Sequence, residues 1–205
     1  MIYSIKNKII DTILFFLMII STGGMFFVLN RNILSIVLFS FLVFTIIFFG
    51  TQMKKKIFYA SILTFLSIFI LGIINYFFAI SEQSINKYGF HFLSLIIGVL
   101  FIMHFQNNRN EKIFLDRFYF VLKIIAFHAL TNFLVYFLFQ NNLSDVVLRD
   151  KDIYKTFLHV FYYIPEKSMV SIFNFEFCRN QGLFWEPGIL QIYLNMLFFL
   201  EAFIF

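Results

Sequence analysis

Long apolar runs separated by short polar connections constrain this chain more than any other feature. About 20 apolar residues suffice for a helix to cross the hydrocarbon of a bilayer. The chain holds six runs of about this length, at residues 12–29, 33–50, 57–80, 90–105, 118–139 and 187–205. The first two are so close together that their helices must be antiparallel neighbours. We therefore predict an all-α polytopic membrane protein, with about six transmembrane helices in a single membrane domain spanning residues 1–205.

The composition excludes an ordinary soluble domain. Hydrophobic residues make up 61% of the chain and charged residues only 13%, whereas a soluble domain carries about 25% charged residues. The net charge of +5 comes from basic residues in short connections, so it predicts membrane topology and no nucleic-acid partner. The one cysteine, Cys178, excludes an internal disulfide and a cysteine metal cluster. We expect no metal and no cofactor.

The distribution of lysine and arginine predicts the orientation, because positively charged connections stay on the cytoplasmic side. The amino terminus and the 51–56 and 106–117 connections are the basic ones, while the alternate short connections hold only Arg31 and only Lys87. The amino terminus is therefore expected in the cytoplasm. Five crossings then place the connection at 141–186 outside the cell membrane.

The external connection at 141–186 is too aromatic for a plain linker. Its apolar residues between Ile153 and Ile164 recur with helical spacing, with polar residues on the other face and Pro165 following, which predicts an amphipathic helix on the membrane surface. Further on, residues 173–177 alternate with the period of a strand, and 179–182 have turn composition. These two features predict a short hairpin before the last span.

Polar residues inside spans are costly and are candidates for function. His128, Thr131 and Asn132 share one face of the fifth run, where they either bond to a neighbouring helix or line a substrate cavity. Gln191 and Asn195 share a face of the sixth run in the same way. That face continues from Glu186, so these two residues are candidates for either packing or substrate binding.

Charged, aromatic and turn-forming residues gather at Phe177–Tyr193, beside the start of the last span. Pro187 suits the first turn of a helix, and Glu186 before it suits the positive end of the helix dipole. One interpretation is structural: Arg179 pairs with Glu186, and Trp185 lies in the interfacial aromatic belt. The other is functional, because free N–H groups at a helix start and a guanidinium together bind phosphate oxygens.

The segment RNQGLFWEPGILQIY at 179–193 resembles a motif of bacterial O-antigen and capsular polysaccharide polymerases, within the O-antigen ligase and polymerase superfamily. In that family an extracytoplasmic arginine, a glycine and an acidic or Asn residue before proline lead into a membrane helix. By this resemblance Arg179 corresponds to the motif arginine, Gly182 to its glycine, and Glu186 with Pro187 to the pair at the helix start.

The resemblance implies a glycosyltransferase in the bacterial inner (cytoplasmic) membrane that needs no metal. Its substrates would be oligosaccharide repeat units on undecaprenyl pyrophosphate, joined by inverting transfer into O-antigen or capsule of the cell surface. Arg179 would stabilise the departing pyrophosphate, and Glu186 would either orient Arg179 or accept the proton of the acceptor hydroxyl. Gly182, Trp185, Gln191, Asn195 and His128 are the expected substrate-binding residues. A flippase and a chain-length regulator are the expected protein partners.

The chain also departs from this family, whose members have more spans and a second polar external loop. We therefore expect an amino-terminal portion of such a protein, inactive alone if incomplete. Two alternatives stay open. A ligase would share the motif and pass the glycan to a lipid or protein acceptor, and a non-enzymatic protein of polysaccharide export would not depend on Arg179 and Glu186.

Overall fold

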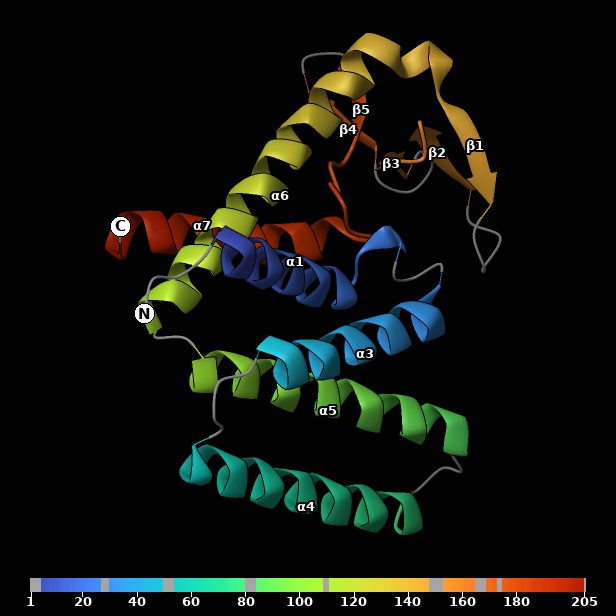
Figure 1. The fold of residues 1–205 in the computed structure, drawn as a ribbon. Coiled ribbons are helices and arrows are strands. Elements are labelled where there is room, and N and C mark those ends of the chain that lie inside the picture. The colour runs from blue at the N-terminus through green and yellow to red at the C-terminus, as the bar shows by residue number, and fades with distance from the viewer. Residues whose placement is uncertain are drawn as a thin grey trace. The chain divides into compact units, whose positions relative to one another are not determined.

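The computed structural model describes residues 5–26, 30–49, 54–79, 84–108, 111–147, 153–164, 169–172 and 175–204. Most of these residues are helical. Two small antiparallel sheets are formed by strands that come between the last two α-helices in chain order (Figure 1). The helices are α1 (Ile5–Ser21), α3 (Arg31–Phe49), α4 (Lys55–Phe77), α5 (Ile85–Asn108), α6 (Glu111–Phe139) and α7 (Pro187–Phe203). The strands are β1 (Ser144–Val147), β2 (Ile153–Phe157), β3 (Phe161–Tyr163), β4 (Met169–Ile172) and β5 (Phe175–Cys178).

In the described ranges four helices are long and apolar enough to cross a membrane, which is compatible with a helical membrane protein. They are residues 31–48, 55–77, 88–106 and 111–142. These correspond to the second, third, fourth and fifth predicted spans. The first and sixth predicted spans correspond to shorter helices, because α1 and α7 have 17 residues each.

The first helix ends earlier than the sequence predicts. We expected a continuous span to residue 29, but α1 ends at Ser21 and the chain turns at Thr22–Gly23. Gly23 has φ +156°, a conformation that glycine tolerates and other residues rarely adopt. Gly24 then forms an isolated antiparallel bridge with Phe184. The glycine pair thus breaks the apolar run and turns its backbone toward the distant 183–185 segment.

The chain packs as two compact units, residues 1–31 with 117–205 and residues 32–116. In the second unit α4 and α5 lie side by side (Figure 1). Edge-to-face ring contacts join Phe69 to Phe92 with centroids 5.8 Å apart, and Tyr76 to Tyr88 with centroids 5.3 Å apart. No residue of α4 is buried, as expected for a helix whose surroundings are lipid or another protein segment.

The amphipathic helix predicted for 153–164 is wrong. Residues 153–157 and 161–163 are β2 and β3, which form a three-stranded sheet with β1 in the order β1-β2-β3. Tyr154 and Thr156 are buried while Ile153 is exposed, so burial alternates with the period of a strand. The turn between the strands contains Leu158 and His159, both with φ near +55°, which excludes a helix there. Pro165, the expected helix stop, lies outside the described residues.

A hairpin lies before the last helix, as predicted, but its residues differ from the strand at 173–177 and the turn at 179–182 that the sequence predicts. Strands β4 and β5 are antiparallel, and Met169 pairs with Cys178 and Ile172 with Phe175. The residues that connect the two strands, 173–174, lie outside the described residues, and 179–182 follow the second strand and do not join the two. Residues 179–182 instead lead from β5 toward α7.

Candidate functional site

The side chain of Asn180 connects the predicted site to α6 by hydrogen bonds. Its Nδ2 donates to the carbonyl oxygen of Ala129 at 2.6 Å, and its Oδ1 accepts from Nδ2 of Asn132 at 3.0 Å. The same Oδ1 accepts from the backbone N–H of Gly182 at 2.9 Å, which closes an Asx turn. Asn132 is fully buried, so its hydrogen bond holds the side chain of Asn180, the residue that follows Arg179, in one position.

A second attachment joins the site to the end of α1. The N–H of Met25 donates to the carbonyl oxygen of Leu183 at 2.8 Å, and the N–H of Trp185 donates to that of Gly23 at 3.0 Å. Phe184 is fully buried and its ring stacks on Tyr193 of α7 with centroids 5.1 Å apart. The segment 180–185 is therefore held by residues 23–25, which follow α1, by α6 and by α7.

Gly182 has a structural reason to be glycine. Its φ of +57° lies in the left-handed region that disfavours other residues. A Cβ atom at this position would lie 3.2 Å from Cδ1 of Leu190 and 3.5 Å from Cβ of Ala129. Gly182 thus lets the backbone pass closely between α6 and the first turns of α7.

Arg179 and Glu186 are both exposed at the ends of this fastened segment. Among the described residues no ion pair joins them, so the predicted Arg179–Glu186 pair is not present. Glu186 is in extended conformation at the N-cap of α7 and its side chain makes no capping hydrogen bond, while Pro187 occupies the first turn as predicted. Among the described residues, both charged side chains are thus exposed and not paired with each other.

The other predicted binding residues are less closely grouped. Trp185 is 38% exposed beside Glu186. Gln191 and Asn195 are exposed on α7. His128 is half-buried on α6, next to the Asn180 contact at Ala129, and its ring stacks on Phe161 of β3 with centroids 5.0 Å apart. His128 therefore packs against the sheet, while Thr131 bonds to its own helix through the carbonyl oxygen of Phe127.

Sequence reasoning missed three participants. Asn180 was assigned only to a turn, yet it makes the central hydrogen bonds of the site. Gln181 is fully buried, and within the described part of the chain neither amide atom has a hydrogen-bond partner, a costly state for a buried amide. Gly23 was placed inside a span, although adjacent glycines in an apolar run can indicate a helix break.

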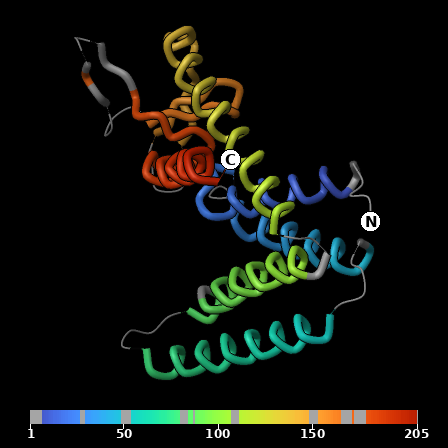
Figure 2. Tube along the Cα trace, turned by 90° about the vertical axis from the view of Figure 1, so that its left-hand side faces the viewer, coloured from blue at the N-terminus to red at the C-terminus, as the bar shows by residue number. Residues whose placement is uncertain are grey.

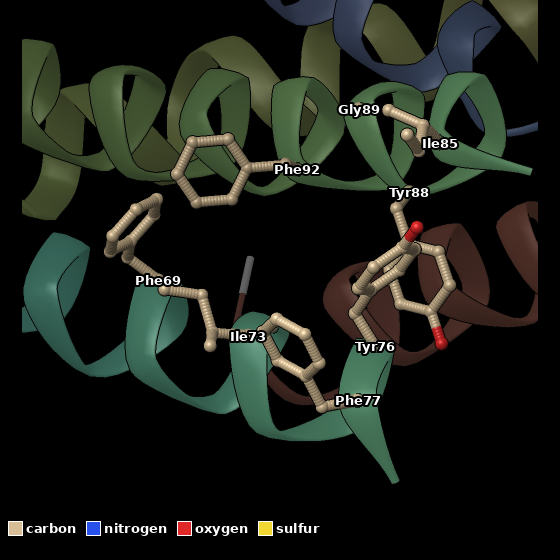
Figure 3. A pocket seen from close by; sticks show the side chains of 9 residues that line it. Phe69, Ile73, Tyr76, Phe77, Ile85, Tyr88, Gly89 and Phe92 are labelled. Atoms are coloured by element: carbon tan, nitrogen blue, oxygen red, sulfur yellow. The ribbon is translucent and has the colours of Figure 1, made fainter. Parts of the chain in front are cut away.

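The described cavities lie elsewhere, in the unit containing α4 and α5. One has a volume of about 340 Å³ and is open between the two helices (Figure 3). Its lining residues are Phe69, Gly72, Ile73, Tyr76, Phe77, Ile85, Tyr88, Gly89 and Phe92. This lining has no titratable group apart from two tyrosines, so it suits an apolar occupant and not the chemistry of Arg179 and Glu186.

A metal site is not formed by the described residues, because nowhere among them do three or more His, Cys, Asp or Glu side chains gather to hold an ion. No family model, curated protein or solved structure matches the chain. The candidate site therefore stands on its residues and geometry.

Proposed function

We propose that the protein polymerises oligosaccharide repeat units carried on undecaprenyl pyrophosphate, by inverting glycosyl transfer at the outer face of the bacterial inner membrane. The observation that carries this proposal is the contrast at 179–186. The backbone is held by residues 23–25, α6 and α7, yet Arg179 and Glu186 at its two ends are exposed and unpaired with each other. Fixed donors that face an open space are what stabilises developing charge.

The reaction follows from these two groups. The acceptor sugar's hydroxyl oxygen attacks the anomeric carbon of the donor glycan, and the bond from that carbon to the pyrophosphate oxygen breaks. Arg179 carries a fork of N–H donors that matches the oxygens of the departing pyrophosphate. The amino-terminal end of α7 adds positive potential through the helix dipole. Glu186 accepts the hydroxyl proton or orients Arg179 over the pyrophosphate.

Substitutions at Arg179 test this function. In the source bacterium, Arg179→Ala is expected to abolish polymer longer than one repeat unit, and Arg179→Lys to reduce it strongly, because an ammonium cannot bind two phosphate oxygens in the same plane. Surface polysaccharide separated by gel electrophoresis gives the readout. Lys155→Ala is the matched control, since it removes one positive charge from the same connection and lies on β2 instead of beside α7. Normal polymer from both Arg179 variants would exclude this mechanism.

Glu186→Gln separates its two roles. A general base loses nearly all activity when its carboxylate is removed, whereas an orienting amide retains much of it. The ligase alternative is distinguished in the same gels. Loss of ligation leaves long polymer on undecaprenyl pyrophosphate, while loss of polymerisation leaves single repeat units on the final acceptor.

A further inference from the structure

One face of α6 carries a long exposed apolar stripe, which Lys123 interrupts near its beginning. It consists of large side chains that are between 39% and 75% exposed and that recur at intervals of three or four residues as far as Phe137, with Leu138 directly after it: Phe120, Ile124, Phe127, Leu130, Leu134, Phe137 and Leu138. At about 1.5 Å per residue the stripe is ~27 Å long, close to the hydrocarbon thickness of a bilayer, about 30 Å. Apart from Lys123, whose Nζ lies 4.2 Å from the centroid of the Tyr119 ring, this face holds no charged residue between Phe120 and Leu138. Its length and composition match the lipid-facing side of a single crossing.

The opposite face of α6 carries polar groups in its second half. His128, Asn132, Tyr136 and Gln140 follow one another at intervals of four residues, so they share one side of the helix. The hydroxyl of Tyr163 donates to the carbonyl oxygen of Asn132 at 2.8 Å, and Gln140 donates to the Tyr136 hydroxyl at 3.2 Å. Strands β2 and β3 therefore lie along the second half of α6 (Figure 2).

The site segment contacts the middle of α6. Ala129, which accepts the hydrogen bond of Asn180, lies midway between Phe120 and Leu138. This proportion does not depend on the tilt of α6 in the membrane. If the stripe marks the hydrocarbon, Asn180 lies about halfway across it.

Helices α1 and α7 lie beside only the first half of the stripe. Near its inner end, Tyr119 of α6 donates to Glu201 of α7, and Phe118 packs against Phe15 of α1 with ring centroids 5.7 Å apart. The other ends of α1 and α7 meet where Thr22 bonds to Tyr193 at 2.7 Å. Beyond that level α6 continues with strands beside it in place of helices (Figure 1).

From these levels we infer that the start of α7 and the 179–186 segment lie within the depth of the bilayer, in a water-filled recess, with the outer half of α6 as the wall between recess and lipid. The acyl chains of the outer leaflet contact the apolar stripe of α6. Non-helical backbone at membrane depth is stable only where protein or water satisfies it, and the exposed charged side chains of Arg179 and Glu186 require water. A partial helix whose start faces a mid-membrane cavity is a known way to bind anionic groups.

Spin labels along the stripe test the depth. In a Cys178→Ala background reconstituted into phosphatidylcholine vesicles, single cysteines at Ile124, Leu130, Leu134 and Leu138 are labelled with a nitroxide. Collision with oxygen and with a water-soluble nickel complex is then measured. We expect oxygen collisions to dominate at all four positions and to be highest at Leu130, near the middle of the stripe. Val147→Cys, exposed on β1, is the control that the nickel complex must reach.

Two results would overturn the inference. Strong nickel collisions at Leu134 and Leu138 would show that the outer half of α6 stands in water. Low collisions with both reagents at these positions would show that protein covers the stripe. Neither result depends on glycosyl transfer, so the depth and the proposed function can fail separately.

Trp185 allows the same question to be asked of the native sequence, because it is the chain's only tryptophan. Its fluorescence in vesicles is expected to be quenched more by phospholipids brominated in the middle of the chain than by those brominated near the headgroup, and also by aqueous acrylamide through the recess. Val147→Trp in a Trp185→Phe background is the control, quenched by acrylamide and not by mid-chain bromine. The same pattern from both tryptophans would contradict the proposed depth.

Discussion

Asn132 and Asn180 are 48 positions apart in sequence and are joined by a hydrogen bond of 3.0 Å from Nδ2 of the first to Oδ1 of the second. Asn132 is fully buried on α6, and Asn180 directly follows Arg179. The position of the candidate arginine is therefore set by an amide pair and not by an ion pair with Glu186. Within the described part of the chain, the Arg179 side chain is exposed and makes no ion pair with Glu186.

Removal of the Asn180 side chain is expected to destabilise the protein. Asn180→Ala leaves Nδ2 of Asn132 without its partner, and an orphaned buried donor costs about 1–3 kcal/mol. Thermal unfolding in detergent measures the change. Asn195→Ala, the same substitution at an exposed position of α7, is expected to have little effect. Equal melting temperatures for the two variants would contradict the role of Asn180.

A double-mutant cycle isolates the pair itself. Asn132→Ala and Asn180→Ala combined are expected to cost less than the sum of the two single changes, by about 0.5–3 kcal/mol, because contacting residues couple. Unfolding free energies of the four proteins give the coupling. Strict additivity would mean that Asn180 is held by Ala129 and Gly182 alone.

Two glycines near the start of α7 are expected to respond to alanine in opposite directions. Gly182→Ala forces a left-handed φ on a residue with a Cβ and brings that atom to 3.2 Å from Leu190, so it should cost about 1–2 kcal/mol. Gly188→Ala meets no atom within 4 Å and should gain up to about 1 kcal/mol through helix propensity. Melting temperatures of the two variants are compared with the parent. A stable Gly182→Ala protein would disprove the conformational requirement.

The helices were predictable from the sequence because apolar runs of this length have few alternatives in a chain of this composition. Four of the six runs are helices long enough to cross a membrane. The prediction of a continuous helix in the first run was wrong. The helix ends before Gly23, and Gly24 forms a bridge with Phe184, a residue far away in the chain. Local hydropathy carries no information on such a partner.

In the 153–164 segment, the helical spacing of the apolar residues led to the wrong secondary structure. Its apolar residues fit helical spacing because Phe157 and Phe161, four apart, face each other across a strand turn. The helix start at Glu186 and Pro187 was predictable, since Pro187 is the first residue of α7, whereas the functional assignment of Arg179 and Glu186 stays a prediction. Its fastening was not predictable, because the Asn132–Asn180 bond joins residues 48 positions apart.

The β2–β3 turn offers a stabilising substitution. Leu158 has φ +55° and is largely exposed, so Leu158→Gly removes backbone strain without loss of packing. A gain of about 1 kcal/mol in unfolding free energy is expected, measured by thermal unfolding in detergent. Val160→Gly in the same turn lacks this strain and should instead cost about 0.5–1 kcal/mol. A loss of stability in Leu158→Gly would contradict the turn geometry.

Cys178 should react slowly with thiol reagents in the folded protein. Burial raises the pKa of its thiol, partly offset by a hydrogen bond with Tyr136 and by the charge of Lys155, and only the thiolate reacts. Near pH 8 its alkylation by iodoacetamide is expected to be slower than in detergent-unfolded protein, since a raised pKa leaves a smaller fraction of thiolate. Mass spectrometry follows the modification, and Val147→Cys in a Cys178→Ala background provides an exposed thiol.

The same shift sets a pH dependence of stability. A folded-state pKa above the unfolded value stabilises the protein below the ordinary thiol pKa, about 8.5, and this contribution is lost as the pH rises through the folded value. Burial also raises the pKa of Tyr163 above its usual 10.0, in the same direction. The melting temperature is therefore expected to fall from about pH 8.5 upward, and Cys178→Ala should weaken the first part of that decline. A melting temperature that rises over this range would contradict the burial of both groups.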